Sequence, residues 1–126
     1  MYVIYGKVMR GRGYGKKIGY PTANLDRRDY TRLRKKPAQG VYAGEGLIQR
    51  TGRRYKTGIV IGPKDRTGLP RIEAYLLGFT GVLYGEKMTL SLRKYLRRFM
   101  SFRNEGVLKK QILKDMERVR KMVKLT

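Results

Sequence analysis

The chain has 126 residues, and its 31 Lys and Arg against 9 Asp and Glu give a formal net charge of +22. It contains no Cys and no His, which excludes disulfides, thiolate metal sites and catalysis by Ser-His-Asp or Cys-His groups. This length predicts a single domain over residues 1–126 with one modest core. The excess of positive charge predicts an anionic partner, which is nucleic acid, anionic lipid or a polyphosphate ligand.

The chain offers no sign of a membrane protein. No apolar run reaches the roughly 18–20 residues that a membrane-spanning helix needs. The first residues alternate polar and apolar side chains and lack the apolar core of a signal peptide. We therefore expect a soluble, cytoplasmic protein with no membrane partner. We also expect a monomer.

The first half of the chain predicts short strands separated by charged loops. Strands are expected over residues 2–9, 41–49 and 54–61. A turn at residues 50–53 joins the second strand to the third. The charged segments 26–37 and 62–70 have no clear period and predict surface loops.

The second half predicts two further strands and then a helix. Residues 71–79 and 86–95 are strand-like, and the second of these ranges alternates apolar with polar side chains. Over residues 105–124 the apolar positions follow helical spacing, and Asn104 stands where a helix cap is expected. The order predicts a small antiparallel β-barrel that a C-terminal helix closes or covers.

A glycine-rich, basic run over residues 11–19 is the first segment that suggests chemistry. Its glycines expose backbone N–H groups, and Arg12, Lys16 and Lys17 add positive charge, a combination suited to a phosphate chain. The run is neither a Walker A loop nor a dinucleotide-binding motif. A flexible hairpin loop is the alternative interpretation.

Pro21-Thr22-Ala23-Asn24 is the second such segment. In an extended chain, Thr22 and Asn24 project their side-chain oxygens to the same side. One hydroxyl and one amide oxygen can serve as hard ligands for Mg²⁺, together with nucleotide phosphates and water. An Asx or ST turn is the alternative.

Among the nine carboxylates, Glu73 stands out because it lies mid-strand between apolar neighbours. Such a carboxylate faces either solvent or a ligand cavity, and partial burial in a cavity raises its pKa towards the range of a general base. Glu105, Asp115 and Glu117 fall in the predicted helix. We expect them to pair with Lys or Arg three or four residues away.

Together these motifs resemble those of the riboflavin kinase family. A riboflavin kinase module also forms the C-terminal half of bacterial bifunctional FAD synthetases. The resemblance covers nearly the whole chain. Its most specific parts are Gly11-Arg12-Gly13-Tyr14-Gly15, Ile18-Gly19-Tyr20-Pro21-Thr22-Ala23-Asn24-Leu25, Ile72-Glu73-Ala74-Tyr75-Leu76-Leu77, Leu83-Tyr84-Gly85 and Leu96-Arg97 with Phe102 after it.

The resemblance implies a mainly β fold, a six-stranded Greek-key-type antiparallel β-barrel with a C-terminal α-helix. It also implies transfer of the γ-phosphoryl group of a nucleoside triphosphate to the 5′-hydroxyl of riboflavin, which gives FMN. Glu73 would act as the base, and Thr22 and Asn24 would hold Mg²⁺, for which Mn²⁺ or Zn²⁺ could substitute. ATP is favoured as the donor, and CTP is not excluded.

The same resemblance implies two groups of binding residues. The nucleotide-binding group is Gly11, Gly13, Gly15, Lys16, Lys17, Gly19, Pro21, Thr22, Asn24, Tyr84 and Gly85. The flavin-binding group is Glu73, Arg97 and Phe102.

The sequence departs from the family pattern in three segments that border these sites. Residues 62–68 lack the usual Pro-Thr-aromatic stretch, residues 77–82 lack acidic side chains, and no Pro-Glu follows Arg97. These departures leave the nucleotide preference and the flavin affinity open.

Two other functions compete with the kinase. The first is a small basic β-barrel that binds RNA without catalysis, to which ten Tyr offer stacking partners. The second is a kinase-derived domain that keeps a flavin or nucleotide as a regulatory ligand. The joint presence of Thr22, Asn24 and Glu73 favours the enzyme.

Overall fold

The computed structural model describes residues 1–10 and 20–126. Six strands form a closed barrel in the order β1-β2-β5-β4-β3-β6, and every neighbouring pair is antiparallel. The strands are β1 (Tyr2–Met9), β2 (Thr22–Leu25), β3 (Gly40–Ile48), β4 (Arg54–Lys64), β5 (Pro70–Leu76) and β6 (Lys87–Arg97). Within the described residues, the helices are α2 (Arg28–Thr31) and α3 (Glu105–Met122).

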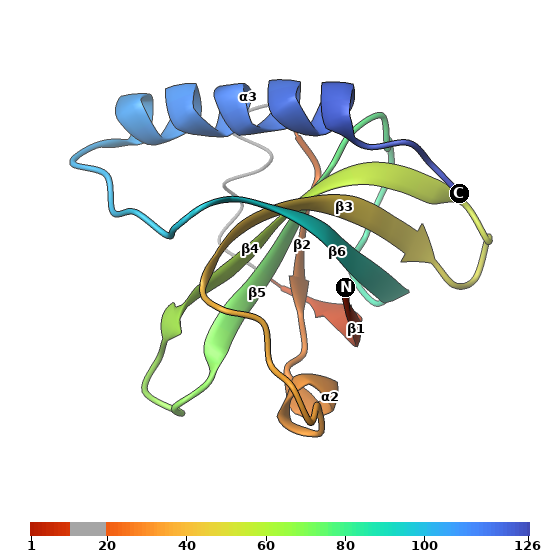
Figure 1. Ribbon diagram of the computed structural model, residues 1–126. Helices are drawn as coiled ribbons and strands as arrows, with labels where there is room; N and C mark the ends of the chain where they lie inside the picture. Colours follow the sequence, from red (N-terminus) through yellow and green to blue (C-terminus); the bar gives the residue numbers. More distant parts are fainter. Residues whose placement is uncertain (11–19) are drawn as a thin grey trace.

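The predicted fold class is confirmed, including the Greek key. Strands β3, β4 and β5 follow one another as hairpins, and β6 then returns to lie beside β3. The spatial order β6-β3-β4-β5 is the Greek-key arrangement. Figure 1 shows α3 lying along the outside of this barrel, with α2 at the opposite end.

Alternation along the strands produces two apolar layers. Inward-facing residues such as Ile4, Ile59 and Leu90 fill the barrel. A second layer lies between the outer face of the barrel and α3, where Val41 and Ala43 pack with helix residues such as Met116. The outer faces of β3, β4 and β5 are therefore partly covered, and a cleft can form beside the helix.

Most of the predicted elements are observed with small changes of boundary. The strand predicted over 71–79 ends at Leu76, because Gly78 adopts a positive φ of 87° that breaks the strand. The helix begins at Glu105 as predicted, and the backbone N–H of Val107 donates to the Asn104 side chain at 2.9 Å. Among the described residues, no helix has the length and apolar content to cross a membrane.

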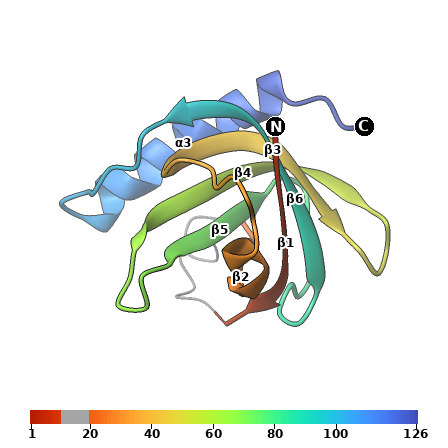
Figure 2. The same cartoon turned by 60° about the horizontal axis from the view of Figure 1, so that its bottom comes forward.

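Two of the predicted loops are wrong in part. Segment 26–37 contains the short helix α2, whose Tyr30 is buried in the barrel core. Figure 2 shows α2 against the end of the barrel. Segment 62–70 is strand at both ends, since β4 continues to Lys64 and Pro70 begins β5 and pairs with Lys64 after a register shift, and only residues 65–69 form the loop. The extra residue of this bulge interrupts the alternation of apolar and polar side chains, so the sequence pattern does not predict a strand here.

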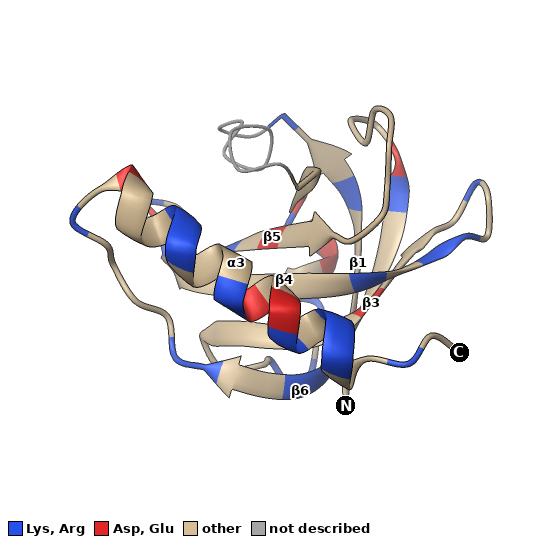
Figure 3. Cartoon of the chain, turned by 90° about the horizontal axis from the view of Figure 1, so that it is seen from above, with Lys and Arg blue, Asp and Glu red and all other residues tan. Residues whose placement is uncertain are grey.

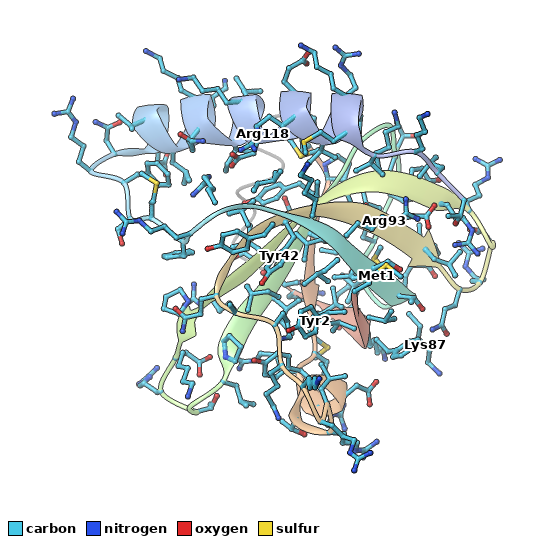
Figure 4. All side chains as sticks on the ribbon, viewed as in Figure 1. Met1, Tyr2, Tyr42, Lys87, Arg93 and Arg118 are labelled. Atoms are coloured by element: carbon cyan, nitrogen blue, oxygen red, sulfur yellow. The ribbon has the colours of Figure 1, made fainter. Side chains whose placement is uncertain are left out.

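A buried carboxylate ties the tail after α3 to the barrel. Glu45 of β3 is 2% exposed and accepts hydrogen bonds from Arg93 (2.8 Å) and Arg54 (3.2 Å). The backbone N–H and hydroxyl of Thr126 donate to the same carboxylate at 3.0 and 2.9 Å. Figure 4 labels Arg93, which lies on β6 and also donates to the backbone carbonyl of Lys124. These bonds fix the end of α3 and thereby its position over the sheet.

Candidate active site

The site begins on the outer face of the sheet, where β2 and β5 pair. Ala23 and Leu25 of β2 point into the barrel core, so the alternating residues Thr22 and Asn24 lie on the outer face. Asn24 is directly opposite Glu73 on β5, and Thr22 is opposite Tyr75. Side chains directly opposite each other have Cβ atoms about 4.5–5.5 Å apart. The fold therefore brings the three residues singled out in the sequence into one small group.

A cleft of about 630 Å³ extends from Glu73 across the outer face towards α3. Val60 of β4, which is paired with Glu73, continues its floor, and α3 contributes Ile112. Arg97 and Phe102 line the cleft as well. Its volume falls within the range of about 300–1,000 Å³ that small-molecule sites occupy. All three residues predicted to bind the flavin therefore lie in one cleft.

A network of hydrogen bonds orients Arg97 in this cleft. Its Nε and Nη2 donate to the two oxygens of Asp115 at 3.0 and 2.7 Å, and Gln111 donates to the same carboxylate at 3.0 Å. The guanidinium carbon lies 5.7 Å from the centre of the Phe102 ring, within the range of cation–π contacts. A planar cation and an aromatic ring thus form one wall of the cleft.

The pairing predicted for Asp115 from the sequence is wrong. Asp115 does not pair with a neighbouring Lys or Arg of the helix, as expected, but is buried and pairs with Arg97 on β6. The sequence contained a sign of this burial, because helical spacing places Asp115 on the same face as the apolar residues Ile112 and Val119. The prediction holds for Glu117, which pairs with Arg120 and Lys121.

On the other side of Glu73, the end of β1 approaches β2. Met9 is opposite Asn24, and the turn after Leu83 is tied to β1 by a bond from the Gly85 N–H to the Val8 carbonyl at 2.9 Å. The Tyr84 side chain in this turn is 55% exposed, and the Arg10 guanidinium carbon lies 5.0 Å from its ring centre. This arrangement brings the predicted nucleotide residue Tyr84 to the β2 side of the site.

The backbone of Pro21 is fixed by the sheet, since its carbonyl accepts the N–H of Leu76 at 3.1 Å. The predicted phosphate-binding residues before it lie outside the described residues. They are Gly11, Gly13, Gly15, Lys16, Lys17 and Gly19.

The donor set at β2 fits a magnesium–nucleotide complex better than a protein-only metal site. Residues 1–10 and 20–126 contain no cluster of three His, Cys, Asp or Glu that could hold a metal. The Thr22 hydroxyl donates to the carbonyl of Tyr20 at 3.3 Å, a bond that leaves its lone pairs available for a cation. With the Asn24 amide oxygen it offers two hard ligands, and Mg²⁺ commonly takes its others from phosphates and water.

These features define a barrel in which the Glu73 carboxylate stands between a cleft of small-molecule size and the pair of oxygen-bearing side chains Thr22 and Asn24. The pair offers hard oxygen ligands, and the cleft has apolar, aromatic and guanidinium walls. The model of the flavokinase family, described as riboflavin kinase, matches residues 1–123, and the chain belongs to this family.

Curated relatives support the same assignment. The RNA-binding riboflavin kinase RibR of Bacillus subtilis is 33% identical over 129 residues, covering 99% of this chain and 53% of the relative. The bifunctional riboflavin kinase/FMN adenylyltransferase of Escherichia coli K12 is 34% identical over 128 residues, covering 99% and 39%. The chain thus spans about half or less of the length of these two relatives.

Two solved structures resemble the barrel. A protein from Streptococcus pneumoniae described as a macrolide-efflux protein has a TM-score of 0.79 and 29% identity, covering 96% of this chain and 39% of that one. The riboflavin kinase of Trypanosoma brucei has a TM-score of 0.66 and 22% identity, covering 95% and 75%. At that identity the second structure supports the fold alone.

Proposed function

We propose that this chain transfers the γ-phosphoryl group of ATP to the 5′-hydroxyl of riboflavin, producing FMN and ADP. The observation that carries the proposal is the position of Glu73. It is paired laterally with Asn24 on one side and with Val60, in the floor of the cleft, on the other. A hydroxyl group held at Glu73 would therefore lie between the cleft and the Thr22 and Asn24 side chains.

Riboflavin fits the cleft beside α3. Its three-ring system is flat and largely apolar, and its ring edges carry carbonyl and nitrogen acceptors. Phe102 and Ile112 offer apolar contact, while the Arg97 guanidinium offers hydrogen-bond donors. Because Asp115 holds that guanidinium through two hydrogen bonds, Arg97 is oriented before the ligand binds.

The nucleotide belongs on the β2 side. Thr22 and Asn24 would supply the protein oxygens that bind Mg²⁺. When bound, Mg²⁺ would neutralise negative charge on the phosphates. Mn²⁺, another oxygen-preferring ion, suits the same ligands. Tyr84 and Gly85 would lie near the base, and the glycine-rich segment 11–19 would lie near the phosphates. The donor nucleotide itself is tested by comparing ATP with CTP.

In the proposed step the riboflavin 5′-oxygen attacks the γ-phosphorus. The new O–P bond forms as the bond between the γ-phosphorus and the bridging oxygen breaks, and ADP leaves with that electron pair. Glu73 accepts the hydroxyl proton. Such a transfer depends on positioning and charge neutralisation more than on covalent catalysis, so the absence of His and Cys is no obstacle.

The decisive experiment incubates the purified chain with riboflavin, Mg²⁺ and either ATP or CTP, followed by chromatography for FMN. Glu73→Gln keeps the shape of the side chain but removes the base, and we expect turnover to fall about 100-fold or more. Glu117→Gln, an exposed carboxylate of α3 outside the cleft, is the matched control and should keep full activity. Unchanged FMN production by Glu73→Gln would remove this residue from the mechanism.

The same assay separates the competing functions. A barrel that only binds RNA would form no FMN with either nucleotide and would not bind riboflavin. A regulatory domain would bind riboflavin without turnover. We place the reaction in the cytoplasm, where nucleoside triphosphates are available, and expect a monomer because the closed barrel leaves no free strand edge for pairing.

A further inference from the structure

Within the described residues, some Lys and Arg side chains form ion pairs with carboxylates, and others on the surface do not. Seven carboxylates form ion pairs with Arg or Lys: Asp26, Asp29, Glu45, Asp65, Glu86, Asp115 and Glu117. Helix α3 nevertheless carries a row of cations, Lys110, Lys114 and Arg118, in no ion pair with any residue of 1–10 or 20–126. We call these three residues the basic row of α3.

Lys110 and Lys114 lie on the side of α3 that faces away from the barrel, and Arg118 lies at the edge of that side, from which its side chain reaches β6. The residues of the basic row alternate with the buried positions Ile112, Met116 and Val119, which pack against the sheet. All three are exposed. Positions four residues apart lie about 6 Å from each other along a helix axis, so the row presents evenly spaced charges. Figure 3 shows the Lys and Arg bands of α3 from this outer side, with further basic positions on β6 nearby.

The row works against the stability of the helix. Like charges four residues apart destabilise a helix, and the row contains two such pairs, Lys110 with Lys114 and Lys114 with Arg118. The Arg118 side chain, labelled in Figure 4, donates a hydrogen bond to the Leu96 carbonyl at 3.2 Å and thereby lies towards β6. The exposed Arg98 and Arg103, in the segment between β6 and α3, extend the positive surface.

We propose that the basic row of α3 binds the phosphate backbone of a nucleic acid strand, without regard to base sequence. Evenly spaced cations suit a polymer of regularly spaced phosphates. Helix α3 contains no aromatic residue that could stack on bases, so the contacts are electrostatic and carry no base recognition. This inference does not rest on the proposed kinase activity.

A membrane surface suits the row less well. Helices that lie on membranes bury an apolar face in the lipid, whereas the apolar face of α3 is already covered by the barrel. The exposed large apolar residues of α3, Leu113 and Met122, stand nine positions apart among cations and form no continuous apolar face. The row also lies apart from the cleft, to which α3 contributes other residues, among them Ile112 and Asp115.

The test measures binding of the full chain to a short fluorescent single-stranded RNA, by anisotropy over a series of NaCl concentrations. In Lys110→Gln/Lys114→Gln, two phosphate contacts are lost, so the slope of log K against log[salt] should become shallower by about 1.4. Affinity near 0.1 M salt should fall roughly 10- to 30-fold. The variant should fold normally, because it removes a like-charge pair, and its FMN production should match that of the unmodified chain.

Arg34→Gln/Lys35→Gln is the matched control. It removes the same charge from an exposed segment after α2, at the opposite end of the barrel from α3 (Figure 1). We expect its slope to stay close to that of the unmodified chain. Equal losses in the two double variants would overturn the proposal, because they would show that net charge and not this row governs binding. Absence of RNA binding, or row-dependent binding to anionic phospholipid vesicles in its place, would overturn it as well.

Discussion

Glu45→Gln is expected to destabilise the protein strongly although the side chain lies outside the proposed site. The Glu45 carboxylate is 2% exposed and receives hydrogen bonds from Arg54, Arg93 and Thr126. The substitution keeps the shape of the side chain but leaves two guanidinium groups without their counter-charge. Breaking a buried ion pair in this way costs about 3–5 kcal/mol.

That cost is reduced here because the two arginines are partly in water. The side chains of Arg93 and Arg54 are 25% and 42% exposed, and solvent screens their charge. We therefore expect a loss of about 2–3 kcal/mol in the free energy of unfolding. For a chain of this size the loss corresponds to a fall in Tm of about 6–12 °C.

Urea and thermal unfolding followed by circular dichroism measure this loss. The matched control is Glu117→Gln, which removes a carboxylate whose ion pair lies at the surface and is half exposed. Exposed pairs contribute about 0–1 kcal/mol, so the control should change stability little. Equal stability of the two variants would refute the reasoning that burial makes the Glu45 network important.

The same network predicts how stability depends on pH. Burial raises the pKa of Glu45, but hydrogen bonds from Thr126 and the charge of Arg93 outweigh it and hold the pKa below the ordinary value of 4.5. A carboxylate with a lowered pKa stabilises the fold above its ordinary pKa, and this contribution disappears as pH falls through the lowered value. The unmodified chain should therefore lose stability below about pH 4.5, and Glu45→Gln should lose less over the same range.

Two further predictions concern the proposed active site. Thr22→Ala should mainly weaken binding of the metal–nucleotide complex, which a titration of FMN production against Mg²⁺ measures, and an unchanged titration curve would count against the assigned role. Asp115→Asn removes the charge that orients Arg97, so the KM for riboflavin should rise about tenfold, equivalent to about 1.4 kcal/mol, with a smaller change in kcat. An unaltered KM in an Asp115→Asn protein that folds normally would show that Arg97 does not contact the flavin.

The sequence by itself determined the elements whose apolar pattern is strong. The alternation of Met88, Leu90 and Leu92 predicted β6, and helical spacing after Asn104 predicted α3. It also singled out Glu73 as a carboxylate placed mid-strand. These predictions succeed because strand and helix periods are properties of neighbouring residues, and a period records which face of an element will be buried.

Only the tertiary structure decided which polar groups meet. Barrel closure brings β6 beside β3, which buries Glu45 among the arginines of two strands. The packing of α3 on the outer face places Asp115 against Arg97 and completes the cleft. The pairing of Asn24 with Glu73 likewise depends on strand register. Register and closure follow from the sum of contacts distant in the chain. Local spacing therefore predicts ion pairs within one helix, such as Glu117 with Arg120, but not the partner of a charged side chain on another element.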